Sequence, residues 1–167
     1  EREEIRKILL RLTELIRTKK EEIIRIKEIL ERLDYLNAKT VYLINKKCTV
    51  PKVINKEYLK LVEARHPLID ENTVVPINFE LGNSENIMLI TGPNTGGKTV
   101  TLKVAGLLTL MALSGIPVPA NEKTEIGHFG SVLADIGDEQ SIEQNLSSFS
   151  GHVKKIKEIM EEANSSS

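Results

Sequence analysis

Residues 92–99 read GPNTGGKT and follow the GxxxxGK(S/T) spacing of loops that bind the phosphates of a nucleotide. Glycine lets the backbone turn tightly, so that successive amide N–H groups surround an anion at the start of a helix. We expect the Lys98 ammonium to bridge the β- and γ-phosphates, the Thr99 hydroxyl to bind Mg²⁺, and the Asn94 amide to reach the γ-phosphate. The predicted cofactors are therefore ATP and Mg²⁺. The predicted contacts are Gly92, Pro93, Asn94, Thr95, Gly96, Gly97, Lys98, Thr99 and Val100.

The segments on either side of this loop give it the context that the chemistry requires. The apolar run IMLI at residues 87–90 predicts a short strand that is buried on both faces. The apolar run after the loop predicts a helix that ends near Ser114, because Gly115 and Pro117 follow. A strand, a glycine-rich loop and a helix in this order are typical of phosphate-binding loops. The alternative, a glycine-rich turn with an incidental lysine, would need neither the strand before the loop nor the helix after it.

Residues 1–47 predict a helical segment. Apolar residues recur at alternating steps of four and three from Ile5 to Leu33, which is a heptad pattern. The pattern is interrupted around Lys19, so one long helix and two helices with a joint would both fit. The apolar seam could pair with a second copy of the chain or with another helix of the same polypeptide. About four heptads are close to the minimum for a coiled coil, which favours the second alternative.

Residues 48–167 predict an α/β domain. Alternation of apolar and polar residues predicts strands in YLKLVEA and in VVPINFEL, and Pro76 favours an edge position for the second of these. A further strand is expected in SVLADIG and a helix in HVKKIKEIMEEA. We therefore divide the chain into a helical segment, 1–47, and an α/β domain, 48–167, that carries the phosphate loop.

Several ordered segments resemble the MutS family of mismatch-repair ATPases. The GPN start and the double glycine of that family occur in TGPNTGGKT, and similar segments are ARHPLID upstream, SGIPVPA after the helix, and ADIGDEQSIEQNLSSFSGHV near the family's Ser-Thr-Phe motif. The resemblance covers roughly residues 50–165 and is strongest to the bacterial branch that suppresses recombination. It implies an ABC-type P-loop ATPase core, here incomplete, and it identifies residues 1–47 with lever-like helices that precede this core.

The resemblance also implies an assembly. In this family two subunits face each other, and each nucleotide lies between one phosphate loop and the signature segment of the partner. Ser147 and Ser148 match the signature hydroxyls and would act in trans on the partner's γ-phosphate, whereas without a partner they would be N-caps of a helix from His152. The resemblance thus implies a full-length homodimer that acts on branched or recombining DNA, through regions mostly outside this sequence. The single cysteine, Cys48, makes a reducing, cytoplasmic setting the expected one. Val74 or Val75 falls roughly where the family packs a side chain against adenine, and a valine of an edge strand explains the residue equally well.

Hydrolysis in this class requires a Walker B strand that ends in Asp and Glu. The family has that strand just after a segment like EIMEEAN, and the 167 residues contain no apolar run with paired carboxylates at that place. We therefore expect the chain alone to hydrolyse ATP poorly or not at all. A nucleotide-binding interaction module without hydrolysis is the alternative. A small-molecule kinase would need arginines in a lid, and no Arg follows Arg65.

Composition excludes other classes of function. The net charge of −1 gives no overall attraction to nucleic acid, although residues 1–47 hold 13 basic against 9 acidic side chains. A single cysteine, Cys48, cannot form an internal disulfide, and the apolar run from Val104 to Leu113 is too short to cross a membrane. The spacing of His66, His128 and His152 indicates no metal site. The sequence begins without Met or a signal-peptide pattern, and we expect it to be part of a longer chain.

Overall fold

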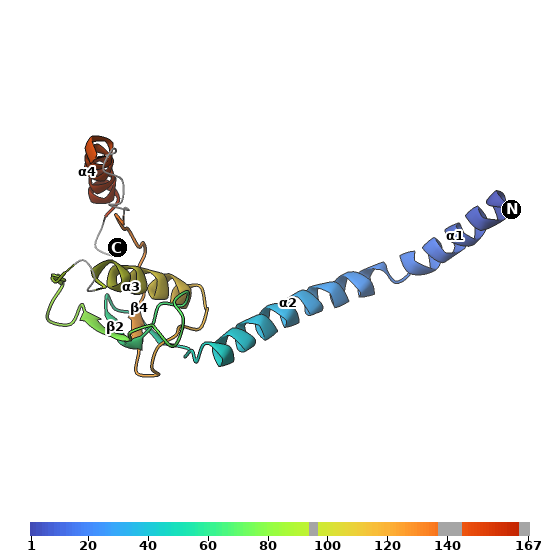
Figure 1. The fold of residues 1–167 in the computed structure, drawn as a ribbon. Helices are drawn as coiled ribbons and strands as arrows, with labels where there is room; N and C mark the ends of the chain where they lie inside the picture. Colours follow the sequence, from blue (N-terminus) through green and yellow to red (C-terminus); the bar gives the residue numbers. More distant parts are fainter. Residues whose placement is uncertain (94–96, 137–144, 164–167) are drawn as a thin grey trace. The chain divides into compact units, whose positions relative to one another are not determined.

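The computed structural model describes residues 1–93, 97–136 and 145–163 (Figure 1). By its contacts the chain divides into two compact units, Glu1–Val41 and Tyr42–Ser167. No helix within the described ranges is long and apolar enough to span a membrane.

The first unit is helical. α1 spans Arg2–Arg17, and α2 spans Lys20–Asn45, so that the last turn of α2 belongs to the second unit. Glutamates in the first turn of each helix, and Arg17 in the last turn of α1, favour these ends through the helix dipole. Between the helices, Thr18 Oγ1 donates to the carbonyl of Leu15 at 2.7 Å. The alternative of two helices with a joint at Lys19 is therefore confirmed.

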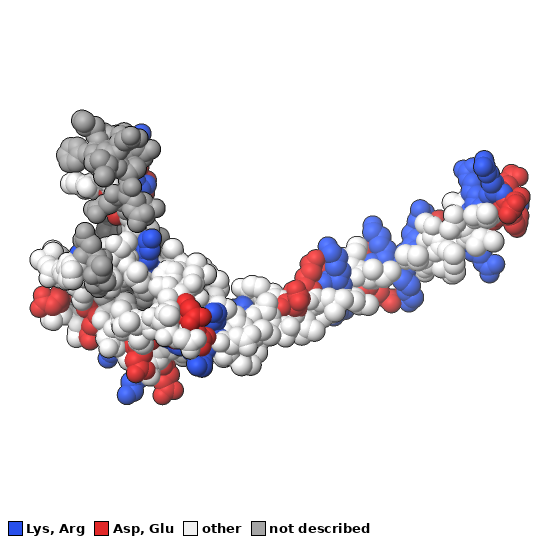
Figure 2. Space-filling model, viewed as in Figure 1, with Lys and Arg blue, Asp and Glu red and all other residues white. Residues whose placement is uncertain are grey.

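Both helices expose their apolar seam. Leu12 and Ile26 are 50% and 56% exposed, and neither helix contains a buried residue. Charged side chains are interspersed with the apolar ones along both helices (Figure 2), and they include exposed pairs such as Lys27 and Glu31 at 3.2 Å. Such exposed pairs add little stability. The apolar seam is therefore the surface through which these helices would gain most from a partner helix.

The second unit contains a four-stranded mixed sheet with the strand order β1-β4-β2-β3. β1 and β4 are parallel, whereas β2 is antiparallel to both β3 and β4. β3 begins directly after Pro76 and lies at an edge of the sheet, as the proline predicts. The strands are β1 (Lys52–Ile54), β2 (Leu59–Ala64), β3 (Ile77–Leu81) and β4 (Glu125–Gly127).

One helix, α3 (Lys98–Leu113), covers the sheet and closes the core (Figure 1). Val104 and Leu108 on this helix are fully buried in one cluster with Leu61 of β2 and Ile126 of β4. Burial of side chains of this size is the main source of stability in a small domain. The helix that carries the predicted phosphate-binding lysine is therefore anchored in the core.

The last described helix, α4, spans Asn145–Glu162 and starts well before His152. Ser147 and Ser148 thus lie within its first turn, and the interpretation of these serines as N-caps of a helix from His152 is wrong. The apolar spacing of Val153, Ile156 and Met160 extends back to Phe149 and Leu146 in steps of three and four, so the sequence carried a helical signal that the prediction of a helix from His152 missed.

Two predicted strands are not formed. Residues 87–90 and 131–136 have no regular secondary structure, and Ile87 and Leu89 are 88% and 85% exposed. A strand requires hydrogen bonds from a neighbouring strand, and no strand of the described sheet pairs with either segment. The strands expected in IMLI and SVLADIG are therefore wrong for this structure. The α/β class is confirmed, while a P-loop core with its own central strand is not present among the described residues.

Candidate nucleotide-binding site

Both glycines at the ends of the predicted phosphate loop have backbone conformations that favour glycine. Gly92 has a φ of 143° and Gly97 a φ of 76°, in the region that L side chains rarely adopt. A Cβ built at either residue would meet nothing within 4 Å. The preference for glycine therefore comes from the backbone conformation and not from packing. Asn94, Thr95 and Gly96 lie outside the described residues.

Lys98 reaches from one end of the loop to the other. It is the first residue of α3, and its Nζ donates to the carbonyl oxygen of Gly92. The ammonium therefore lies where the loop closes, next to the first turn of a helix whose dipole favours anions. The other described contacts in the predicted set, Pro93, Thr99 and Val100, are exposed and accessible to a ligand.

The opposite end of α3 is closed by its own backbone. Gly115, with a φ of 69°, donates its N–H to the carbonyl of Ala112 at 2.9 Å, and Ile116 donates to Met111 at 2.8 Å. These two bonds form the glycine C-cap in which a left-handed residue ends the helix. The predicted end of this helix at Gly115 is confirmed. The 16 residues of α3 give the loop a rigid support about 24 Å long.

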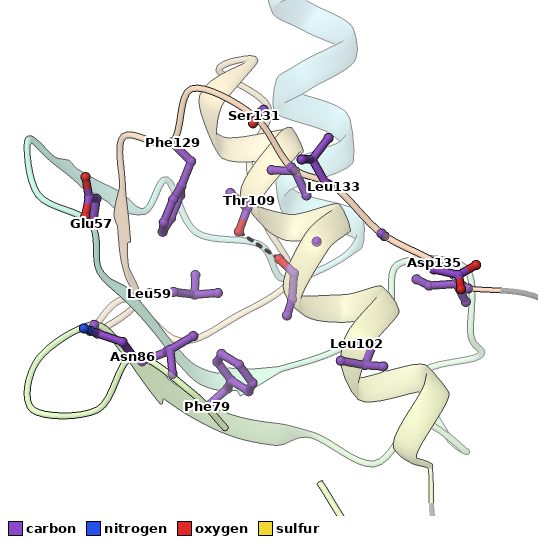
Figure 3. Close-up of a pocket in the computed structure, with 17 residues that line it drawn as sticks. Glu57, Leu59, Phe79, Asn86, Leu102, Thr109, Phe129, Ser131, Leu133 and Asp135 are labelled. Atoms are coloured by element: carbon purple, nitrogen blue, oxygen red, sulfur yellow. Dashed lines mark hydrogen bonds between the residues drawn. The ribbon is translucent and has the colours of Figure 1, made fainter. Parts of the chain in front are cut away.

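A cavity of about 610 Å³ lies beside α3, between this helix, the sheet and residues 129–136 (Figure 3). The hydroxyl of Thr109 in its wall already donates to the carbonyl of Ala105 at 2.8 Å. None of the described loop residues lines this cavity, so the cavity and the loop are two neighbouring features and not one site. Most of the wall is apolar, and its larger apolar side chains are Leu59, Phe79, Leu81, Leu102, Phe129, Val132, Leu133 and Ile136.

The helix with the two predicted trans-acting serines contacts the segment that precedes it in the chain. Ser147 and Ser148 lie in the first turn of α4, but their side chains are outside the described part. Four residues after Ser148 in α4, His152 Nδ1 lies 2.7 Å from Oδ2 of Asp135. This pair was missed by the sequence analysis, because two residues separated by 17 positions leave no local pattern. Among the residues that the structure describes, no group of three or more His, Cys, Asp or Glu could hold a metal ion.

Local hydrogen bonds order the segment that contains Val74 and Val75, the two residues considered for an adenine contact. Val74 donates its N–H to the carbonyl of Asp70 at 2.9 Å and is half-buried, whereas Val75 is 78% exposed. His66 accepts a hydrogen bond on Nδ1 from the N–H of Leu68 at 3.3 Å. This bond uses the histidine to order the loop, which fits a structural residue better than a catalyst.

The single thiol is not activated for nucleophilic chemistry. Burial raises the pKa of the Cys48 thiol, and a hydrogen bond with Tyr42 and the positive charge of Arg65 act in the opposite direction without reversing the shift. Burial, with the neighbouring Cys48, raises the pKa of Tyr42 to about 12. A thiol with a raised pKa is mostly protonated at neutral pH and is a poor nucleophile.

Known proteins match this chain over the loop and its flanking segments. The family model described as MutS domain V matches residues 88–167. The chain is 62% identical over 161 residues to an Endonuclease MutS2 of Fusobacterium nucleatum. The aligned residues make up 96% of this chain and 21% of that protein. It is 48% identical over 167 residues to an Endonuclease MutS2 of Caldanaerobacter subterraneus, and the aligned residues make up 100% of this chain and 21% of that protein.

The chain belongs to the MutS family. Within that family it is similar to the proteins named Endonuclease MutS2, including one of Finegoldia magna at 49% identity over 160 residues, 96% of this chain and 20% of that protein. The chain thus spans about a fifth of the length of these relatives.

Proposed function

We propose that residues 92–100 bind ATP together with Mg²⁺. The observation that carries this proposal is the reach of the Lys98 ammonium from the first turn of α3 to the carbonyl of Gly92. A lysine is a flexible point charge, so its ammonium can turn from a carbonyl to phosphate oxygens when they enter the loop. The N–H groups of the first helical turn favour the same anion. Thr99 supplies the hydroxyl for Mg²⁺, and Asn94 supplies an amide for the γ-phosphate.

We infer a wider role from the family. The chain would be the nucleotide-binding part of a cytoplasmic, homodimeric protein that acts on branched or recombining DNA in recombination control or repair. Residues 1–47 would form its lever-like helices, and residues 48–167 part of its ATPase domain. Ser147 and Ser148 would act in trans on the nucleotide of the partner subunit. Their place in the first turn of α4 supports this role, because backbone N–H groups there have no acceptor within the helix.

The chain by itself is proposed to bind ATP without efficient hydrolysis. None of its apolar runs ends in the Asp and Glu that would hold Mg²⁺ and activate water. Asp135 follows an apolar stretch, but it is hydrogen-bonded to His152 and lies in a segment without strand structure. The second candidate function, a nucleotide-binding interaction module, is favoured by the exposed apolar seam of α1 and α2. Steady ATP turnover by the purified chain, abolished in Lys98→Ala, would contradict the proposed lack of efficient hydrolysis and the interaction module, but not ATP binding by the loop.

Titration of the purified protein with a fluorescent ATP analogue and Mg²⁺ tests the nucleotide site. The Lys98→Ala variant is expected to bind about tenfold more weakly or worse, because charged hydrogen bonds to phosphate are lost. Lys103→Ala is the matched control, since Lys103 has the same charge and is exposed on the same helix. Absence of binding, or an equal loss in both variants, would contradict the proposal.

A further inference from the structure

The contact between Asp135 and His152 determines that Nδ1 of the histidine ring carries a proton. His152 Nδ1 and Asp135 Oδ2 are 2.7 Å apart, which is a normal length for a strong hydrogen bond. An ionised carboxylate only accepts, so the proton of this bond must lie on Nδ1 of the ring. The two side chains are 39% and 24% exposed. A partly exposed pair adds little to stability, so its main effect is expected on the position of the helix that carries His152.

The pair joins two segments that flank the proposed nucleotide chemistry. Asp135 lines the same cavity as Leu102, which lies in α3 one turn after Lys98 (Figure 3). His152 lies in α4, four residues after Ser148, which is about one helical turn. The hydrogen bond therefore connects the helix of the serines to the wall beside the phosphate-loop helix of the same chain.

We propose that Asp135 and His152 are positioning residues that form a latch, which holds α4 at the cavity wall formed by residues 131–136 and sets where the first turn of α4 meets the nucleotide of a second subunit. The inference rests on the proposed function, because the position of α4 matters only if Ser147 and Ser148 act on the nucleotide of a partner subunit. The latch does not contribute to binding of nucleotide by the loop of its own chain. Its loss therefore affects the association of two subunits across the nucleotide and leaves the loop intact.

Substitutions of His152 by two amides separate a hydrogen-bonding role from a packing role. The amide nitrogen of asparagine lies near the place of Nδ1 and can donate to Asp135, whereas the amide of glutamine extends toward the place of Nε2. His152→Asn should therefore behave like the unchanged protein, and His152→Gln should behave like His152→Ala and Asp135→Ala. Glu158→Gln is the matched control, because Glu158 pairs with Lys155 at 3.3 Å in the same helix and has no place in the latch.

Two measurements on the same samples decide the matter: the Kd of the fluorescent ATP analogue, and self-association with ATP and Mg²⁺ by analytical ultracentrifugation. We expect unchanged nucleotide affinity and about tenfold weaker association in Asp135→Ala and His152→Ala. The double variant should be no worse than either single one, because both remove the same interaction. Unchanged association, additive losses, or equal losses in His152→Asn and His152→Gln would overturn the latch.

The same experiment distinguishes failure of the latch from failure of the proposed function. If Lys98→Ala keeps its nucleotide affinity, the proposed site is wrong. If the unchanged protein binds ATP but two copies of it do not associate in the presence of ATP, the role of the serines in trans is wrong, and the proposed latch is then wrong as well. If nucleotide binding depends on Lys98 and association depends on ATP, but the latch variants associate normally, only the latch is wrong.

Discussion

Arg65 closes the carboxyl end of α2 by donating from Nη2 to the carbonyl oxygen of Lys47 at 2.8 Å. The same nitrogen lies 3.2 Å from the carbonyl oxygen of Lys46. Lys46 and Lys47 directly follow the last residue of α2, at the helix end that carries partial negative charge. The Arg65 guanidinium therefore donates hydrogen bonds there and also supplies a favourable positive charge. The backbone N–H of Arg65 also donates to Pro119 at 2.9 Å. One arginine thus connects the end of α2, strand β2 and the segment after α3.

The first prediction concerns this arginine. Arg65→Gln should lower the free energy of unfolding by about 1–2 kcal/mol, because the partly buried carbonyl of Lys46 and the exposed carbonyl of Lys47 lose a charged donor. Arg65→Lys keeps the charge but not the forked donor, and an intermediate value is expected. Urea unfolding followed by circular dichroism measures both. Arg25→Gln, at an exposed position in the second turn of α2, should change stability by less than about 0.5 kcal/mol; equal effects at the two positions would contradict the capping role.

The second prediction concerns a glycine that is required by packing. A Cβ at Gly127 of β4 would lie 2.1 Å from the carbonyl oxygen of Lys56 and 2.7 Å from the backbone nitrogen of Tyr58. Backbone atoms cannot move aside cheaply, so Gly127→Ala should destabilise the protein by about 2 kcal/mol or more. Gly151 in α4 is the control, because a Cβ there meets nothing within 4 Å. Gly151→Ala should raise helix content, and a melting temperature lowered as much as by Gly127→Ala would count against this explanation.

Patterns local in the sequence predicted the helices α1, α2 and α3 and the strands β2 and β3. The heptad steps from Ile5 to Leu33 predicted helix across α1 and α2, and Gly115 predicted the end of α3. The interruption at Lys19 left one long helix and two helices with a joint both open. Each of these signals comes from a few neighbouring residues and acts through the backbone or through one helix face. Pro76 acts in the same way, because a residue without an N–H cannot lie inside a sheet.

Features that depend on distant residues were not predictable. The apolar run at 87–90 has the composition of a buried strand, but strand formation depends on a neighbour that the described sheet does not provide. β1 and β4 have only three residues each and no measurable alternation, and they form because they pair with each other. The bond of Arg65 to the end of α2 and the bond of Asp135 to His152 likewise join residues whose separation carries no periodic signal.

The third prediction separates backbone strain in the loop from packing. Gly97 has a φ of 76° and open space around its Cβ position, so Gly97→Ala adds only the cost of a left-handed alanine, about 1–2 kcal/mol. That strain can be relieved by a shift of the loop, which would move the first turn of α3 away from the phosphates. We therefore expect a fluorescence titration to give weaker ATP binding, with little change in the unfolding transition of the core. Gly106→Ala, where a Cβ would lie an ordinary 3.6 Å from Val132, should leave the affinity unchanged; a similar loss in both variants would argue against strain in the loop.

The fourth prediction concerns stability at high pH and uses the raised pKa of Tyr42. Burial, with the neighbouring Cys48, raises the pKa of this phenol from 10.0 to about 12 in the folded chain. A group with a raised folded pKa contributes stability that is complete below its unfolded pKa and is lost as the pH rises through the folded value. The free energy of unfolding should therefore fall between pH 10 and pH 12, and it should fall less steeply in Tyr42→Phe, which has no proton to lose. Urea unfolding at a series of pH values measures the two slopes, with Tyr35→Phe as the control because Tyr35 is 53% exposed in the same helix. Equal slopes in the unchanged protein and in Tyr42→Phe would show that burial of this hydroxyl does not hold its proton.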